Sequence, residues 1–326
     1  MTNESLIIKS KSLNQYSYKF DVIKSRTYEE RYIDLDLYKK VISNLDELED
    51  YVGYCYDVKK CERVDWAGTK TILIETFKRK KKSLSVSYAP TRSNPKGRHF
   101  SKEKSLQGMS RKLRHLICHE NYTDIDIKNC HPVIFTQLCS EYNFDCSHIS
   151  YYINNRESCL NELMNITGYS REECKNSMIS LLNGGSCNKI FNNFQVPNWF
   201  SNFAYQIEII HKQLANHDDL KDCHKEVKRK YGLDVFNFNG KVVNRLLCCY
   251  ENILIQHAIY YCSLNGIYVA SPQFDGMLCE NNPILNQNFL QDLEKYILDE
   301  TGFKVNFCIK EMDEHIPLME KLKSLS

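Results

Sequence analysis

The sequence predicts an α+β fold in which a small antiparallel sheet carries acidic residues at the ends of its strands. Three observations predict it. TDIDIK (123–128) alternates acidic and apolar residues, as a half-buried strand does. GIYVASPQFDGMLCE (266–280) has the pattern of a strand, a turn and a second strand, with Asp275 at the turn. Several helical segments separate these two stretches, so a helical insertion is expected between strands of one sheet.

The composition is that of an ordinary soluble globular protein. The 326 residues carry a formal net charge of +2, and 42% of them are hydrophobic. No run approaches 18 apolar residues and the N-terminus has no apolar segment, so neither a membrane span nor a secretory signal is expected. The 15 cysteines include no C-x-x-C pair, which favours reduced thiols in an intracellular protein, either cytoplasmic or nuclear. HLICH (115–119) lacks a second ligand pair, so zinc is not expected there.

A strongly basic window stands out from this near-neutral composition. Between Lys78 and Arg114 the sequence holds 13 lysines and arginines and a single acid, Glu103. A solvated charge run would account for KRKKK (78–82) alone, and this run also has the composition of a nuclear import signal. The length of the whole window favours a polyanion partner such as nucleic acid.

The N-terminal half of the chain yields elements of both kinds. A helix is expected over 34–55 and a strand over 69–77. The segment 89–98 contains two prolines and a glycine, which indicate a linker or turn. A helix over 108–120 leads into the aspartate-bearing strand, and Pro132 suits the first turn of the helix that follows.

A further helix is expected to open at Ser170, where the C-terminal half begins. Ser170 and Glu173 form a capping-box pattern, and Asn183-Gly184-Gly185 is a stop signal. After the strand-turn-strand segment, a last helix and a last strand complete the α+β pattern. The remaining expected elements are helices over 199–217, 219–231, 241–262 and 287–299, and a strand over 303–311.

The acids of the first strand raise a chemical question. Asp124 and Asp126 share one face of the strand, whereas Ile125 and Ile127 point the other way. Two carboxylates on one face repel each other unless a positive charge lies nearby, and a metal ion is the usual one. The alternative is a surface strand with its acids in water.

A second group of residues points to phosphate chemistry. Arg171, Lys175, Ile179 and Leu182 fall on one face of the capped helix, so two cations project together beside an apolar stripe. Alone, they would be the solvated edge of a helix. Together with aspartates on two separate strands, they match phosphoryl transfer from a nucleotide. There, carboxylates hold two Mg²⁺ ions, which Mn²⁺ can replace, and cations neutralise the triphosphate.

On these residues the chain resembles family A DNA polymerases and the single-subunit phage-type RNA polymerases. Its size brings it closest to the minimal members found in transposons and viruses, and the resemblance covers roughly residues 96–310. GRHFSKEKSLQGMSRKLRHLI (97–117) is similar to the start of the family's palm. The resemblance implies that Arg98 contacts the primer–template minor groove, and that Gln107 and Arg114 support the duplex or the palm.

The resemblance also implies roles for later residues. Asp126 and Asp275 would bind metal, with Asp124 as an additional candidate, and His131 would lie beneath the incoming sugar. The family's fingers helix reads Arg, three residues, Lys, seven residues, Tyr-Gly, and this chain has asparagine at the tyrosine position. Phe274 and Gly276 also depart from the family pattern around the second metal aspartate. The residues placed on the nucleotide are Arg171, Lys175, Ile179, Asn183 and His131, and those on nucleic acid further along the chain are Asn252 and Gln256.

Four regions follow from the resemblance. They are a reduced, thumb-like N-terminal region (1–95), a first palm part (96–165), helical fingers (166–240) and a second palm part (241–326). The 95 residues before the palm are too few for an exonuclease, so no proofreading is expected. The implied partners are a DNA primer–template or RNA, dNTPs or NTPs, and a helicase or other replication proteins, without a membrane.

Three alternatives stay open at this point. The departures at His131 and Asn183 leave the choice between dNTP and NTP undecided, so a primase or RNA polymerase of the same fold is the nearest alternative. A catalytically inactive nucleic-acid-binding module is the second. A nucleotidyltransferase that extends ends without a template is the third. The many Lys, Asn, Ile and Tyr residues suggest an AT-rich genome, as in a virus or mobile element.

Overall fold

The chain divides into two compact units, each built from discontinuous segments. The computed structural model describes residues 25–31, 35–57, 62–78, 83–92, 94–185 and 194–325. One unit, here called the helical unit, contains Asn129–Glu251 and Leu298–Val305. The other, the sheet unit, contains the described residues of Val22–Lys128 together with Asn252–Ile297 and Asn306–Ser326. The four functional regions expected from the sequence were defined on other grounds and stay a prediction.

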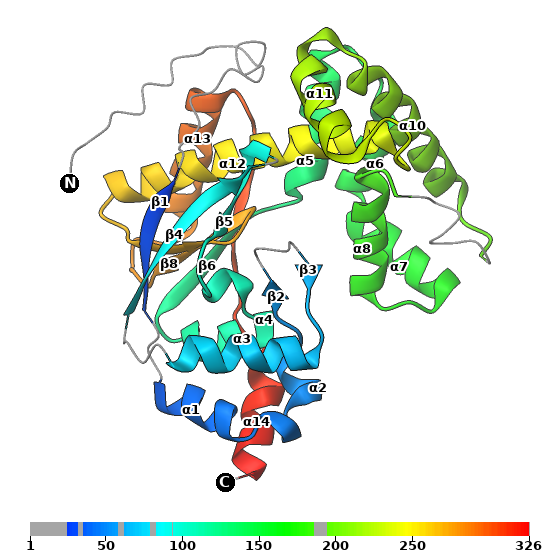
Figure 1. Cartoon of the computed structure of the whole chain (residues 1–326). Helices are drawn as coiled ribbons and strands as arrows, with labels where there is room; N and C mark the ends of the chain where they lie inside the picture. The colour runs from blue at the N-terminus through cyan, green and yellow to red at the C-terminus, as the bar shows by residue number, and fades with distance from the viewer. Residues whose placement is uncertain are drawn as a thin grey trace. The chain divides into compact units, whose positions relative to one another are not determined.

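The predicted antiparallel sheet is present in the sheet unit. It has four strands in the order β7 (Val269–Pro272), β8 (Gly276–Glu280), β6 (Tyr122–Ile127) and β9 (Phe307–Lys310) (Figure 1). Every neighbouring pair is antiparallel. The aspartate-bearing strand β6 is therefore a central strand, bonded on both edges, and the mixed helix-and-sheet class is confirmed.

A second sheet refines one expectation. Its strands run in the order β1 (Arg26–Arg31), β4 (Ser83–Thr91) and β5 (Asn94–Ser101), and a short pair, β2 (Tyr56–Asp57) and β3 (Glu62–Arg63), lies apart. The linker or turn expected over 89–98 is a turn, and it joins β4 and β5 in a hairpin whose two strands were not expected. Proline is tolerated in strands at irregularities and on sheet edges. Pro90 adjoins a register shift and Pro95 lies on the edge strand β5, so both fit.

The strand expected over 69–77 is wrong, because this stretch lies inside helix α3 (Trp66–Lys78). Its buried residues are Thr69, Ile72, Leu73 and Thr76, which follow helical spacing. The β-branched residues favoured a strand, but packing of this face into the core decides the outcome. The helix expected over 34–55 is also corrected. It is divided into α1 (Leu35–Ser43), a 3₁₀ turn (Leu45–Glu47) and α2 (Glu49–Val52), and Gly53 with φ +74° follows.

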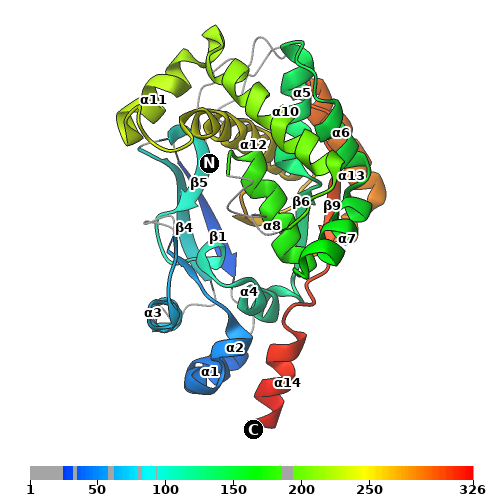
Figure 2. The ribbon, with the colours of Figure 1, turned by 90° about the vertical axis from the view of Figure 1, so that its right-hand side faces the viewer.

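The core of the sheet unit joins one face of the four-stranded sheet to helices. Leu278 of β8 and Tyr122 of β6 pack with buried side chains from α1, α3, α4 (Arg111–Cys118) and α14 (Ile316–Ser324). Figures 1 and 2 show α1, α2, α4 and α14 together at one end of this unit. Elsewhere, Tyr261 of α12 (Phe238–Leu264) packs on Phe289 and Tyr296 of α13 (Gln287–Thr301).

The helical unit confirms most of the helices expected from the sequence. Ser170 and Glu173 form the capping box at the start of α8, with both reciprocal bonds present. Helices α6 and α7 were not predicted, although their buried residues do follow helical spacing. No helix among the described residues is long and apolar enough to span a membrane. The helices are α5 (Cys130–Glu141), α6 (Ser147–Asn154), α7 (Arg156–Thr167), α8 (Arg171–Leu182), α10 (Asn198–Ala215), α11 (Lys221–Tyr231) and the first part of α12.

Candidate active site

The two candidate metal aspartates are brought together by strand pairing inside the sheet unit. Asp126, near the end of β6, lies opposite Gly276, the first residue of β8. The backbone N–H of Ile127 donates a 2.9 Å hydrogen bond to the carbonyl oxygen of Asp275. The turn between β7 and β8 is therefore attached directly to the end of β6. Residues 149 positions apart in the sequence thus share one corner of the sheet.

The turn itself has a demanding geometry. The N–H of Gln273 donates to the carbonyl of Gly276 at 2.7 Å, which closes a hairpin around Phe274 and Asp275. Phe274 has φ +65°, a conformation that costs a residue with a Cβ roughly 1 kcal/mol. A Cβ on Gly276 would lie 2.6 Å from the Asp126 carboxylate, so only glycine leaves room for that side chain. The departure from the family pattern at Gly276 therefore has a local cause.

Crowding and burial disfavour the ionised forms of these carboxyls. Asp124 and Asp126 are each only 7% exposed, which excludes a strand with its acids in water. Burial, together with repulsion from Asp275, raises the pKa of Asp126 to about 7, against the attraction of Lys310. Burial also raises the pKa of Asp124, although the Arg114 guanidinium opposes it. Such a corner favours an additional positive charge.

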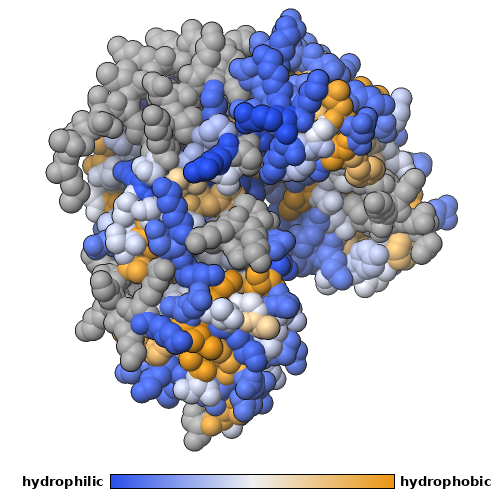
Figure 3. Space-filling model, viewed as in Figure 1, coloured by the Kyte–Doolittle hydropathy of each residue, from blue (hydrophilic) through white to orange (hydrophobic). Residues whose placement is uncertain are grey.

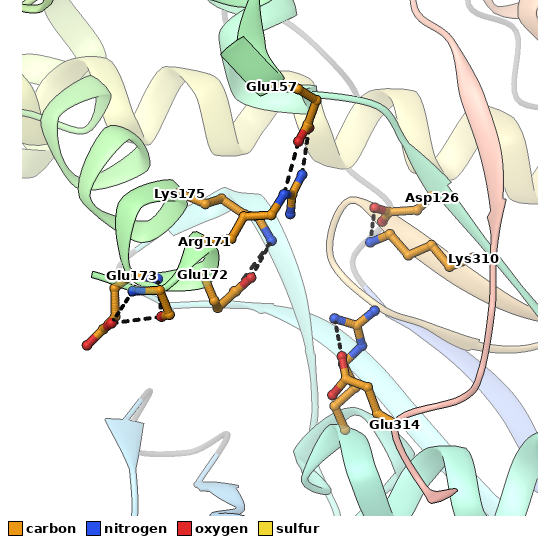
Figure 4. A network of polar contacts seen from close by, with 10 residues as sticks. Asp126, Glu157, Arg171, Glu172, Glu173, Lys175, Lys310 and Glu314 are labelled. Atoms are coloured by element: carbon orange, nitrogen blue, oxygen red, sulfur yellow. Dashed lines mark hydrogen bonds and ion pairs between the residues drawn. The ribbon is translucent and has the colours of Figure 1, made fainter. Parts of the chain in front are cut away.

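Lys310 supplies part of that charge, and sequence reasoning missed it. Its Nζ forms an ion pair with Oδ2 of Asp126 (Figure 4). Burial would lower the pKa of Lys310, but attraction by Asp126 and Asp275 raises it above its ordinary value. Strand β9 is fixed at its start by Glu294, which accepts a 2.7 Å hydrogen bond from the N–H of Phe307. A lone lysine in a C-terminal strand gives no sequence signal until the strand order is known.

Asp124 lies on the core side of Asp126. Its partners in register are Leu278 on β8 and Lys310 on β9, and opposed residues of antiparallel strands share a face. Leu278 belongs to the hydrophobic core described above. Asp124 is thus closer to the core than the corner occupied by Asp126 and Asp275, and its part in metal binding stays a prediction.

Arg98 lies beside the aspartate hairpin. Its guanidinium carbon is 5.1 Å from the centre of the Phe274 ring, and the Phe100 ring meets Phe274 edge-on at 5.4 Å. Phenylalanine at the position before Asp275 therefore packs against the arginine expected to contact the primer. The structure brings Arg98, Phe274 and Asp275 into one local group.

Gln107 and Arg114 are engaged with the backbone. The Gln107 carboxamide donates to the carbonyls of His99 and Pro272 at 3.1 Å each, and it accepts from the N–H of Ser101 at 3.1 Å. One guanidinium nitrogen of Arg114 donates to the carbonyls of Leu106 and Met109. Both residues support the framework around the corner, and contact with a duplex stays a prediction for each.

A buried glutamate that the sequence analysis did not single out joins the two larger sheets. Glu30 of β1 is 0% exposed. Its carboxylate accepts hydrogen bonds from the Tyr88 hydroxyl, from the Ser271 hydroxyl at 3.1 Å and from the N–H of Leu106 at 2.7 Å. Because Ser271 is on β7, Glu30 helps to fix the strand that leads to Asp275. Strand β1 was not predicted from the sequence, so the sequence analysis had no reason to single out Glu30.

In the helical unit, the two predicted phosphate-binding cations are already paired with acids. Nε and one terminal nitrogen of Arg171 contact the two oxygens of Glu157 at 3.0 and 2.6 Å (Figure 4). Lys175 lies 3.4 Å from both oxygens of Glu172. All four side chains are wholly or partly exposed, so these pairs are weak and exchangeable. Ile179, one turn further on, is partly buried.

His131 and Asn183 are held by polar partners within the same unit. Nε2 of His131 lies 2.7 Å from Glu251, whose side chain is fully buried. Burial alone would lower the pKa of His131, but hydrogen bonds to Cys248 and Glu251 outweigh it and raise this pKa to about 10. Asn183 follows the last residue of α8 and accepts a 2.7 Å hydrogen bond from Asn244. Their roles toward a nucleotide sugar stay predictions.

Asn252 and Gln256 lie on α12, within the sheet unit. Both are buried, at 9% and 6% exposure. Among the described residues, neither polar atom of the Gln256 carboxamide has a hydrogen-bond partner. Leaving a buried amide without hydrogen-bond partners costs about 1–3 kcal/mol. A ligand that forms hydrogen bonds with the Gln256 carboxamide would recover this free energy.

The donor set is compatible with magnesium but small. Within the described ranges, no group of three or more His, Cys, Asp or Glu side chains could hold a metal ion. Magnesium is commonly bound by only one or two carboxylates, with phosphate and water filling its other positions. Asp126 and Asp275 meet that requirement, and a divalent cation would relieve the repulsion that raises the pKa of Asp126.

Comparisons with known proteins find likenesses both among curated proteins and among solved structures. No protein-family model matches the chain. A curated protein of the Sputnik virophage, "Putative helicase V13", is 24% identical over 231 residues, which are 67% of this chain and 28% of that protein. The chain therefore spans just over a quarter of that relative's length. Among solved structures, the POL domain of Pol1 from M. smegmatis, in complex with DNA primer-template and dNTP, aligns with a TM-score of 0.49. It is 12% identical and the alignment covers 87% of this chain and 62% of that one.

Proposed function

We propose that the protein is a template-directed nucleotidyltransferase, most simply a minimal family A-like DNA polymerase without proofreading. The observation that carries the proposal is the corner of the sheet at which Asp126 and Asp275 meet. Asp126 is buried near the end of β6, and Asp275 lies in the turn between β7 and β8. Backbone hydrogen bonds fix both positions, and two such carboxylates are the ligands that two-metal phosphoryl transfer needs.

Asp126 and Asp275 would hold two magnesium ions. When bound, the ions would activate the attacking primer hydroxyl and stabilise the leaving phosphate. The chain's own residues do the rest. Gly276 leaves room for the Asp126 carboxylate, and the Phe274–Arg98 contact places a cation beside the hairpin for the primer end. Ion pairing with Lys310 favours the charged form of Asp126.

Arg171 and Lys175 would bind the triphosphate. A nucleotide triphosphate carries more charge than one carboxylate, so it can displace Glu157 and Glu172 from these exposed pairs. The unpartnered Gln256 carboxamide supports a contact with a base edge or sugar of the nucleic acid. His131 and Asn183 would lie near the sugar, and the identity of that sugar follows from the experiment below.

The name of the virophage relative invites a helicase reading, which the sequence does not favour. Helicases of the P-loop class bind ATP phosphates with G-x-x-x-x-G-K-[ST], and this sequence contains no such segment. The match also leaves most of that protein outside the aligned residues. We infer instead that a helicase is a partner for this activity, acting on the same nucleic acid.

The test is extension of a labelled primer on a DNA template with magnesium, with dNTPs and NTPs supplied separately and a lane without primer. Templated addition of dNTPs is expected. Asp126→Asn and Asp275→Asn should each lower it at least 100-fold while duplex binding persists. Asp292→Asn, which changes an exposed aspartate of the same unit, is the matched control and should extend normally.

The other outcomes separate the alternatives. Products from NTPs without primer would indicate a primase or RNA polymerase. Addition that ignores the template base would indicate a template-independent transferase. Tight binding without incorporation under any of these conditions would overturn the enzymatic proposal in favour of a binding module.

A further inference from the structure

We propose that the C-terminal end of α11 and the start of α12 form a binding site for single-stranded nucleic acid. The site, here called the α11 patch, consists of Lys228, Arg229, Lys230, Tyr231 and Lys241 in the helical unit. It goes beyond the proposed function, because binding there requires no catalysis. It also lies outside the basic window of 78–114, whose residues 79–82 and 93 are not among those described.

The cations of the α11 patch are available to a ligand. Lys228, Arg229 and Lys230 are exposed, and no acidic side chain of the described residues lies within ion-pair distance of them. Glu226, the nearest acid on the same helix, is engaged by the buried Arg245 at 2.6 Å. Three adjacent cations without counter-charges form the kind of site that attracts a polyanion.

The first half of α11 provides an internal contrast. Lys221 lies 2.9 Å from Asp218, and Lys225 lies 3.5 Å from Asp222. The same helix therefore pairs its early lysines with acids and leaves its late cations without them. Cations in the last turn also stabilise a helix through its dipole. That effect does not account for Lys241, which comes from a different helix.

An exposed aromatic ring lies between the cations. Tyr231 is 43% exposed, and the Nζ atoms of Lys230 and Lys241 are 4.7 and 4.9 Å from its ring centre. Phe236, five residues on, is 64% exposed. Rings beside cations provide stacking surfaces for bases whose neighbouring phosphates meet the cations. A duplex hides the faces of its bases, so the combination favours a single strand.

Other polyanionic surfaces fit less well. A membrane-bound helix needs a free apolar face, but Cys223 and Val227 of α11 are buried within the protein. An acidic peptide would use the cations and has no need of the exposed rings. Figure 3 shows hydrophilic side chains gathered over the region of α11, as a solvent-facing site requires.

The experiment measures binding of the full chain to a labelled single-stranded oligonucleotide and to a hairpin duplex over a range of salt concentrations. The test variant is Lys228→Ala/Arg229→Ala/Lys230→Ala, and the control is Lys221→Ala/Lys225→Ala on the same helix. Each phosphate contact contributes roughly 0.7 to the log–log salt slope for a single strand. The test variant should therefore reduce that slope by about 2, and the control should leave it unchanged.

The ring is tested separately. Tyr231→Ala should weaken single-strand binding about 5- to 150-fold, the range for loss of one stacked base, with no change in salt slope. Tyr231→Phe should retain binding, which would show that the ring matters more than the hydroxyl. Thermal unfolding of each variant identifies any loss of folding, and all substituted positions in the two sets are exposed.

Three results would overturn the proposal: equal binding by the test and control variants, equal losses for single strand and duplex, or displacement of the oligonucleotide by poly-glutamate as effectively as by unlabelled single strand. Asp126→Asn serves as the link to catalysis. If the Asp126→Asn variant binds the oligonucleotide normally but extends no primer, binding at the α11 patch is independent of the reaction that the protein catalyses. An unchanged salt slope in the Lys228→Ala/Arg229→Ala/Lys230→Ala variant, together with intact primer extension by the unchanged protein, would rule out the α11 patch and leave the proposed function standing.

Discussion

The absence of a Cβ at Gly276 leaves the space that the Asp126 side chain occupies in the candidate site. A Cβ at this position would lie 2.6 Å from an Asp126 carboxylate oxygen and 2.8 Å from the carbonyl oxygen of Ile125. Gly276→Ala should therefore displace Asp126, lower the free energy of unfolding by about 1–3 kcal/mol and reduce incorporation at least tenfold. Chemical denaturation and primer extension on the same preparation measure both effects.

The control for this change is Gly266→Ala in the same unit. Gly266 has φ +69° and no neighbouring atom within 4 Å of an added Cβ. Its substitution should lower stability by about 1 kcal/mol through backbone strain alone, and it should leave incorporation intact. If both variants lost activity equally, general destabilisation and not displacement of Asp126 would be the cause.

Lys310 is expected to substitute for a bound cation. Lys310→Met removes the positive charge from Asp126 and leaves the crowded carboxyls without it. In the absence of divalent ions, the free energy of unfolding should fall by about 1–3 kcal/mol, below the full cost for a buried pair because the lysine side chain is 38% exposed. Saturating Mg²⁺ should then stabilise this variant more than the unchanged protein.

Denaturant unfolding without Mg²⁺ measures the loss of stability, and unfolding with Mg²⁺ measures the stabilisation by the ion. Lys212→Met is the control. Lys212 pairs with Glu208 on a helix surface and is 63% exposed, so its loss should change little. A Lys310→Met protein that matches the unchanged one in metal-free buffer would contradict the assigned role.

At the scale of elements, α5 and α12 are joined by the buried His131–Glu251 pair, which makes stability depend on pH. The pKa of His131 is raised in the folded chain to about 10, from an ordinary value near 6.5. The folded state therefore holds a proton that the unfolded state releases. The contribution to stability is fully present below pH 6.5 and is lost as the pH rises towards 10, at up to about 1.4 kcal/mol per pH unit.

Urea unfolding of the unchanged protein and of His131→Gln at pH 6.5, 8 and 9.5 measures this dependence as a difference. The difference should shrink as the pH rises. His211→Gln is the contrasting control. Burial lowers the pKa of His211 to about 4, so its contribution to stability is lost only as the pH falls. The difference between His211→Gln and the unchanged protein should therefore stay nearly constant between pH 6.5 and 9.5. A pH-independent difference for His131→Gln would contradict the pairing.

The elements themselves were predictable where the signal was local. The capping box of α8, the alternation in β6 and the turn before Gly276 depend on neighbouring residues, and all three are present. Helix α3 was mistaken for a strand because its β-branched residues outweighed the helical spacing of its buried positions. Strand β1 was missed because its pairing with β4 joins residues 52 or more positions apart, which no local pattern contains.

At the scale of the whole molecule, the candidate site also divides into residues with a local sequence signal and residues whose role depends on distant strand pairing. The sequence offers Asp126 and Asp275 as candidates because each ends or interrupts a local strand pattern, and their metal-binding role stays a prediction. It does not offer Lys310 and Glu30, because their importance depends on which strands lie side by side. The acid partners of the two cations differ in the same way. Glu172 lies three residues before Lys175 on the same helix, whereas Glu157 pairs with Arg171 from another helix, which only the fold shows.

The order of segments along the chain has a consequence for how this protein can be divided. From residue 129 onward the chain passes between the two compact units four times, at 128/129, 251/252, 297/298 and 305/306. One of these passages falls within the continuous helix α12, and another within α13. No single cut releases either unit intact, and a fragment that ends inside either helix lacks part of both. A fragment that keeps either unit complete must therefore also contain the segments of the other unit that lie between its own.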